Sequence, residues 1–196
     1  MSPKQQRGEA TVEQVLDAAL GVYAASGEPG LTVSAVTRAS GVSPGSLYHH
    51  FGSIDGLVTA LTLRWLGRLL DRLSGALERT RTARSGIRAV VRAYLDFLRE
   101  HPDAARLVHS ASADRYGMAH APQVRAAQEA RLSPVAGWIQ SRTDAGELAP
   151  LPAPLLESLL LGPVVGVARR WLSVGDVDLD EAVRILPDRI WQSVRP

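Results

Sequence analysis

The chain has 196 residues, of which 45% are hydrophobic, 5% are aromatic and none is cysteine. The lack of cysteine excludes disulfides, thiol chemistry and zinc sites built on thiolates. The formal net charge is only +2, which does not by itself indicate a nucleic-acid partner. A chain of this length can bury a hydrophobic core, and its many Ala, Leu and Arg residues favour helices over sheet. We therefore expect an all-α protein of one or two domains.

The first ten residues are polar, and we expect them to form a mobile arm. Lys4 on this arm is placed to follow a phosphate backbone, although a solvated tail explains the same residues equally well. Thr11 and Gln14 then form a capping-box pattern that predicts the start of an amphipathic helix. That helix ends at residues 26–30, where Gly and Pro make a clear break.

Residues 31–51 predict two short helices joined by a tight turn. Thr32 is a good N-cap for the first helix, which runs to about Ser40, and Gly41 follows where positive φ is often needed. Ser43 caps the second helix, and Pro44 occupies its first position, where a missing N–H costs nothing. Two helices at this spacing are typical of a helix-turn-helix.

The second of these helices has two distinct faces. At 100° per residue, Pro44, Leu47 and Phe51 share the side that must face a core. Gly45, Ser46 and His49 point away from it, with Tyr48 and His50 on the flanks. A small, polar centre suits a DNA major groove, where His49 can reach a base edge and the flanking rings can reach phosphates. The spacing alone is equally consistent with a short helix that caps a bundle.

The rest of the chain is predicted to be helix after helix. Ser53 caps a long helix that continues to about Glu78 and connects the first three helices to the remainder. Further helices are expected at 86–100, 102–113, 122–145, 151–174 and 179–194, with a loop at 114–121. Pro134 and Pro187 are expected to kink their helices.

The helix at 151–174 is apolar all round, which indicates burial on every side. One side can pack on the core of its own chain and the other on a second copy. Gly162 and Gly166 would permit close contact between helices there. The pattern thus predicts a homodimer, and the plainer alternative is a well-packed monomer core.

Motifs for catalysis or metal binding are lacking. The sequence has no HExxH pair, no G-x-S-x-G elbow and no phosphate-binding P-loop. We therefore predict no catalytic residue, no metal site and no cofactor. The longest apolar run, residues 159–168, is far short of the roughly 20 residues of a membrane span. No apolar leader is visible in residues 1–10 either, so a cytoplasmic protein with no membrane partner is expected.

Residues 32–39, 41–43, 45–51 and Leu57 resemble the DNA-binding domain of tetracycline-repressor (TetR) family regulators. The resemblance covers roughly residues 11–60. It implies a three-helix DNA-binding head with a helix-turn-helix at 1–52, a connecting helix at 53–79, and a helical ligand-binding and dimerisation body at 80–196. It also implies a homodimeric regulator, most simply a repressor that a small ligand releases from a palindromic double-stranded DNA operator.

The resemblance carries the DNA contacts onto polar residues of the motif: Thr32, Ser34, Ser43, Gly45, Ser46, Tyr48, His49 and His50. One departure bears on affinity. Where the family commonly has Lys at the start of the long helix this chain has Ile54, and Arg38 is the only Lys or Arg between Gly30 and Leu63. The phosphate contacts must then rely on helix N-termini, hydroxyls, the two His rings and the arm.

The resemblance further implies a ligand pocket in the body. We expect large side chains to line it and to select a small hydrophobic or aromatic effector: Trp65, Tyr94, Phe97, His109, Met118 and Trp138. Aromatic residues at helical spacing are also ordinary core residues. The alternative function is a helical small-molecule-binding module that does not regulate DNA.

Overall fold

The computed structural model describes residues 3–196, with side chains for Gln6 and from residue 8 onward. The described residues form ten α-helices and one 3-10 turn, and no strand occurs among them, in agreement with the all-α expectation. The elements are α1 Pro3–Ser26, η1 Glu28–Gly30, α2 Val33–Ser40, α3 Pro44–Phe51, α4 Ile54–Glu78, α5 Ala83–Glu100, α6 Pro102–Val108, α7 Ala111–Ala119, α8 Ala121–Asp144, α9 Ala153–Ser173 and α10 Leu179–Val194.

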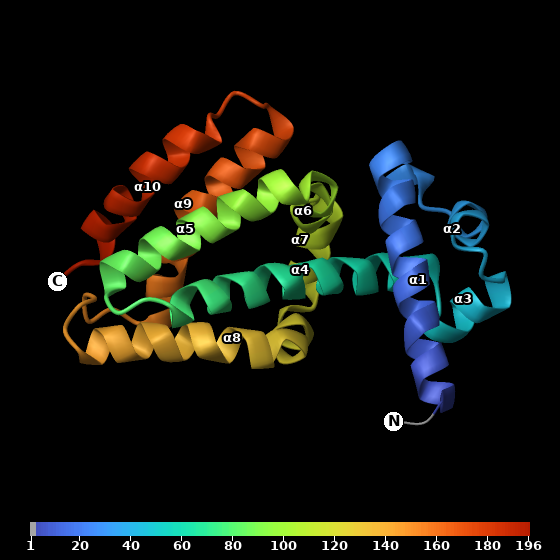
Figure 1. The fold of residues 1–196 in the computed structure, drawn as a ribbon, viewed down its shortest axis with the longest axis horizontal. Helices are drawn as coiled ribbons and strands as arrows, with labels where there is room; N and C mark the ends of the chain where they lie inside the picture. The colour runs from blue at the N-terminus through green and yellow to red at the C-terminus, as the bar shows by residue number, and fades with distance from the viewer. Residues whose placement is uncertain (1–2) are drawn as a thin grey trace.

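The helices form a small head and a larger body (Figure 1). Helices α1 to α3 gather at one end, and α4 runs from them into the body made of α5 to α10. The core is continuous along α4, because Leu57, Trp65 and Leu73 belong to one buried cluster that includes residues of both the head and the body. Arg64 of α4 also donates to Glu13 at 2.9 Å and to Asp17 at 2.8 Å, which ties α4 to α1.

The N-terminal segment differs from the expected arm. Helix α1 begins at Pro3 and runs without a break through Thr11, so the predicted start at the capping box is wrong. Most residues of this stretch are good helix formers, and one Gly inside a helix costs only about 1 kcal/mol. Adding turns to an existing helix gains a hydrogen bond per residue, so the helix behind Thr11 extends backwards.

The body departs from the expected boundaries in three places, and the first is that the helix expected at 102–113 ends as α6 at Val108. Helix α5 begins at Ala83, three residues early, because Thr82 caps it and Ser85 completes a capping box. The predicted loop at 114–121 is instead mostly helix α7, since the Ser110 hydroxyl accepts from the Ala113 N–H at 3.1 Å and opens a new helix. Pro134, Pro163 and Pro187 all lie inside helices.

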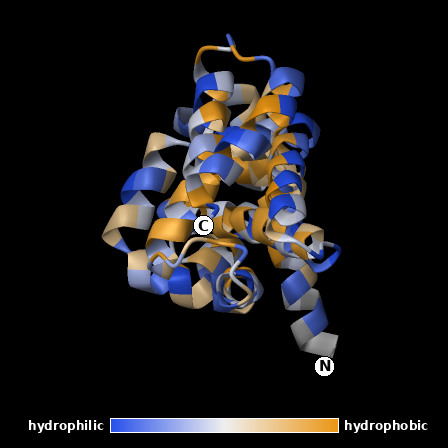
Figure 2. Cartoon of the chain, turned by 90° about the vertical axis from the view of Figure 1, so that its left-hand side faces the viewer, coloured by the Kyte–Doolittle hydropathy of each residue, from blue (hydrophilic) through white to orange (hydrophobic). Residues whose placement is uncertain are grey.

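Apolar and polar segments alternate around the body helices, as expected for amphipathic packing (Figure 2). In the single chain α9 is buried along one face only, through Leu156, Leu160, Val164 and Ala168. The expected burial on all sides is therefore not met within one chain. Among the described residues, no helix combines the length and apolar character needed to cross a bilayer.

Candidate functional site

The helix-turn-helix is formed as predicted and is held by local hydrogen bonds. The Thr32 hydroxyl accepts from the Ala35 N–H at 3.2 Å, and the Ser43 hydroxyl accepts from the Ser46 N–H at 3.3 Å. Gly41 has φ 70°, so it takes the left-handed conformation that ends α2 and turns the chain toward α3. Each short helix therefore begins with free N–H groups that favour an anion.

Helix α3 presents a polar face to solvent. Leu47 is completely buried, whereas Gly45, Tyr48 and His49 are exposed, with Tyr48 50% exposed. Ser46 and His50 are half-buried. Pro44 was expected on the core side but is exposed, because it stands at the first helical position, before α3 meets the core.

The remaining predicted DNA contacts that the structure describes are also exposed. Thr32, Ser34 and Ser43 are all exposed at or near the helix starts. The side chain of Lys4 lies outside the described residues, so its role stays a prediction. Ile54 stands where the family commonly has Lys. It is half-buried and packs against the core cluster, so this position offers DNA no positive charge.

The end of α3 is pressed directly against the start of α4. Gly52, at φ 73°, ends α3, and the Ser53 hydroxyl accepts from the Gly56 N–H at 3.0 Å to begin α4. A Cβ placed on Gly56 would lie 2.0 Å from the Phe51 carbonyl oxygen. Only glycine permits this approach, so Gly56 positions α3 on the connecting helix. Sequence reasoning missed it, and a glycine in the first turn of a helix was the available signal.

The six predicted pocket residues lie in several places. Trp65 and Phe97 lie in the buried core in an edge-to-face contact, with their ring centroids 6.2 Å apart. Both rings also contact His101. Tyr94 contacts His109 instead. Met118 is 77% exposed on α7, since the segment expected to be a loop is a helix that turns this side chain outward. The structure thus does not bring the six together around one cavity.

The Tyr94–His109 pair is a partly buried polar contact between α5 and the end of α6. The Tyr94 Oη and His109 Nε2 atoms are 3.1 Å apart. Burial, and then the nearby Arg169 cation, lower the pKa of His109 from 6.5 to about 4, and burial raises the pKa of Tyr94. The imidazole is therefore neutral at neutral pH, and its Nε2 forms a hydrogen bond with the Tyr94 hydroxyl.

Protonation of His109 should lower the free energy of unfolding as the pH falls. An unfolded histidine binds a proton near pH 6.5 but the folded one only near pH 4, so lowering the pH between these values favours the unfolded state. We expect up to about 3 kcal/mol of lost stability across this range. Urea titrations at several pH values measure it. The His109→Gln variant should show a shallower loss, and an unchanged slope would contradict the assignment.

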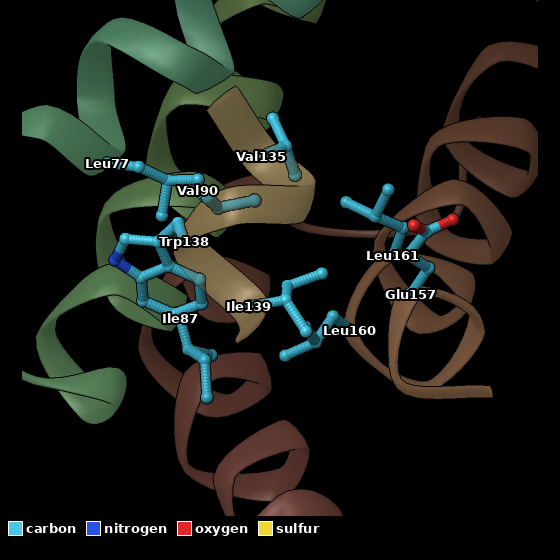
Figure 3. A pocket seen from close by; sticks show the side chains of 9 residues that line it. All are labelled: Leu77, Ile87, Val90, Val135, Trp138, Ile139, Glu157, Leu160 and Leu161. Carbon is cyan, nitrogen blue, oxygen red and sulfur yellow. The ribbon is translucent and has the colours of Figure 1, made fainter. Parts of the chain in front are cut away.

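Trp138 lines a different pocket, between α4, α5, α8 and α9 (Figure 3). Its lining is apolar apart from one carboxylate at the edge: Leu77, Ile87, Val90, Val135, Trp138, Ile139, Glu157, Leu160 and Leu161. The volume is about 30 Å³, room for one or two water molecules. The indole packs against bare backbone, because a Cβ on Gly86 would meet Trp138 Cζ2 at 2.1 Å. Aliphatic residues at core spacing gave no signal in the sequence that they border a pocket.

Comparison with known protein sequences matches the part of the chain that contains the helix-turn-helix. Residues 15–61 match the model for bacterial regulatory proteins of the tetR family. The HTH-type transcriptional regulator BetI of Rhizobium meliloti (strain 1021) is 36% identical over 78 residues, which are 40% of this chain and 38% of BetI. The aligned part thus spans well under half of that relative's length. The family model and this relative describe transcriptional regulators rather than enzymes.

Solved structures share the fold over nearly the whole chain. A TetR family transcription regulator from Marinobacter aquaeolei VT8 superposes with a TM-score of 0.75 at 23% identity, covering 97% of this chain and 98% of that one. The regulator FadR from Bacillus subtilis, in complex with stearoyl-CoA, superposes with a TM-score of 0.70 at 17% identity, covering 91% and 96%. At these identities the likeness establishes the fold of the body.

Proposed function

Because the chain belongs to the TetR family of transcriptional regulators, we propose that it is a repressor that binds a palindromic operator as a homodimer and leaves it when a small apolar effector binds. The observation that carries the proposal is the exposed polar face of α3, held rigidly between two capped helix ends. A helix presented in this way matches the recognition helix of a helix-turn-helix.

An electrophoretic shift with DNA flanking the chain's own coding region tests this function. We expect a shift that a palindromic competitor abolishes and a scrambled competitor does not. Arg38 is the only Lys or Arg between Gly30 and Leu63, which favours the alternative of a ligand-binding module without DNA regulation. The absence of any shift at low salt, where phosphate contacts are strongest, would support that alternative.

His49 is proposed to read a base edge, since it is exposed at the centre of the α3 face. Removal of its ring in His49→Ala should cost roughly 1–3 kcal/mol at one base position and relax the sequence preference there. Tyr48→Phe, which loses only a hydroxyl at the flank, should weaken binding to all operator variants alike. Binding titrations on an operator library measure both. Equal weakening by His49→Ala at every position would assign it to the backbone instead.

The dimer is proposed to form through the open faces of α9 and α10. On α9, Gly162 and Gly166 have no atom within 4 Å of an added Cβ, and Leu155 is 47% exposed. On α10, Ile185 is also 47% exposed. These open, apolar and small residues support an interface in which two helices of one copy pack against two helices of another.

The effector is proposed to enter the pocket beside Trp138. Ligand sites usually measure about 300–1,000 Å³, so a pocket of about 30 Å³ must open by repacking around the indole. Its lining suits an apolar chain or ring, and FadR from Bacillus subtilis, which shares the fold, was solved with stearoyl-CoA. An effector that prefers the opened body lowers the affinity for the operator, and by linkage bound DNA must lower the affinity for the effector by the same factor.

A screen of hydrophobic compounds should find one that raises the melting temperature and releases DNA. In Gly86→Ala the new methyl group displaces Trp138 into the pocket, and we expect that compound to bind about tenfold more weakly, a loss of about 1.4 kcal/mol. Gly137→Ala is the matched control. Gly137 lies on the same helix as Trp138, and a Cβ added to it would meet nothing within 4 Å. Equal affinity in both variants would place the effector elsewhere.

A further inference from the structure

A second and larger cavity lies where the head meets the body. Its volume is about 330 Å³, within the range of small-molecule sites. Its walls come from η1, the start of α4, and α7, so the head supplies one side and the body the other. They comprise Glu28, Leu31, Ile54, Asp55, Val58, Thr59, Thr62, Ser112, Ala113, Arg115 and Tyr116.

Two carboxylates in this cavity lack a cationic partner. Glu28 accepts from the Ser112 hydroxyl, at 2.5 Å to one of its oxygens. Asp55 lies in the first turn of α4. Among the described residues, no Lys or Arg nitrogen pairs with either carboxylate within 4 Å. The guanidinium of Arg115 donates to Ser112 Oγ at 3.3 Å instead. The charged groups of the lining therefore sum to a net negative charge.

Apart from the hydroxyl groups of Thr59, Thr62 and Ser112, the remaining walls are apolar and aromatic. Leu31 is buried, and Ile54 and Val58 are half-buried beside it. The half-buried Tyr116 ring is held in place by stacking on His120 with ring centroids 4.5 Å apart. An aromatic face and aliphatic side chains next to carboxylates that lack a cationic partner form a site for a cation that also carries an apolar group.

We propose that this cavity binds a small protonated amine with an aromatic or alkyl body, its ammonium group bonded to the carboxylates of Asp55 and Glu28. An anion would be repelled by two carboxylates and attracted by only one guanidinium, so the site selects cations over anions of the same shape. This site is separate from the apolar pocket beside Trp138, and its existence does not depend on the proposed repressor function.

Occupancy of the cavity is coupled to the position of the head. The Ser112–Glu28 hydrogen bond links α7 to η1, and an ammonium group that bonds to Glu28 competes with the Ser112 hydroxyl. The bound amine therefore changes the contact between body and head, and with it the affinity for DNA. This second step rests on the proposed function.

The test uses indole compounds of one shape and different charge on the full chain without DNA. By calorimetry we expect tryptamine to bind about tenfold more tightly than the neutral tryptophol, and indole-3-propionate to bind most weakly. Asp55→Asn and Glu28→Gln should each lower tryptamine affinity about tenfold and leave tryptophol unchanged. Arg115→Gln should raise tryptamine affinity. Glu78→Gln, an exposed carboxylate remote from the cavity lining, is the control that should change nothing.

Equal affinities for tryptamine and tryptophol, or a tryptamine affinity that ignores both carboxylate variants, would overturn the site. So would an absence of binding up to about 10 mM, beyond the weak end of small-ligand affinity. A separate titration of operator DNA with and without tryptamine tests the coupling. Bound tryptamine without a change in DNA affinity would refute the coupling alone, whereas a chain that never binds DNA would refute the repressor function and leave the calorimetric result standing.

Discussion

Gly56→Ala is expected to lose operator binding even though alanine is the better helix former. The added Cβ would lie 2.0 Å from the carbonyl oxygen of Phe51 and 3.2 Å from its carbonyl carbon. Both are backbone atoms at the end of α3, so neither can rotate away as a side chain would. Either α3 moves or the head loosens. We expect a stability loss of about 3 kcal/mol and a fall in DNA affinity of more than tenfold, measured by urea unfolding and operator titration.

Gly75→Ala is the matched control for this change. Gly75 lies inside the same helix, and its added Cβ would meet nothing within 4 Å. Alanine there should raise stability by about 0.5–1 kcal/mol, because the helix interior favours it over glycine. The two substitutions are chemically identical and should act in opposite directions. A Gly56→Ala protein as stable as the Gly75→Ala protein would show that the close approach of α3 to α4 is not required.

Gly166→Arg is expected to convert the proposed dimer to monomers. Gly166 is exposed on the open face of α9, where its Cβ would meet nothing in its own chain. The single chain should therefore fold normally, while a second copy packed there would bury an unpaired charge at a cost of about 3–5 kcal/mol. Light scattering measures the mass directly. Operator affinity should fall by about 10³, since a monomer engages one half-site and loses the gain from linking two.

Two further variants make this result specific. Gly162→Arg, one turn earlier on α9 and equally open, should also yield monomers. Gly21→Arg places the same charge on an exposed and open glycine of α1 and should leave the mass unchanged. Leu159→Arg is a poorer test, because Leu159 is half-buried and packs against the core of its own chain. Dimers that persist in both α9 variants would place the interface elsewhere.

The helix-turn-helix was predictable from sequence because its signals are local. The N-caps Thr32, Ser43 and Ser53 each accept from a backbone N–H three residues ahead, and Gly41 adopts positive φ, all at the predicted positions. Such bonds depend on a few neighbouring residues and survive whatever the rest of the chain does. The start of α4 followed from this kind of signal, since Ser53 was recognised as its N-cap.

Features that depend on residues distant in sequence emerged only from the folded chain. The indole of Trp138 packs against Gly86, 52 positions away, and the Ser112 hydroxyl reaches Glu28, 84 positions away. Aliphatic periodicity identifies which residues turn inward, but it is the same for a filled core and for the wall of a cavity. Which inward faces leave space between them depends on how the helices cross and on side-chain volumes. For that reason the residues that line both cavities could be assigned only after the helices were placed.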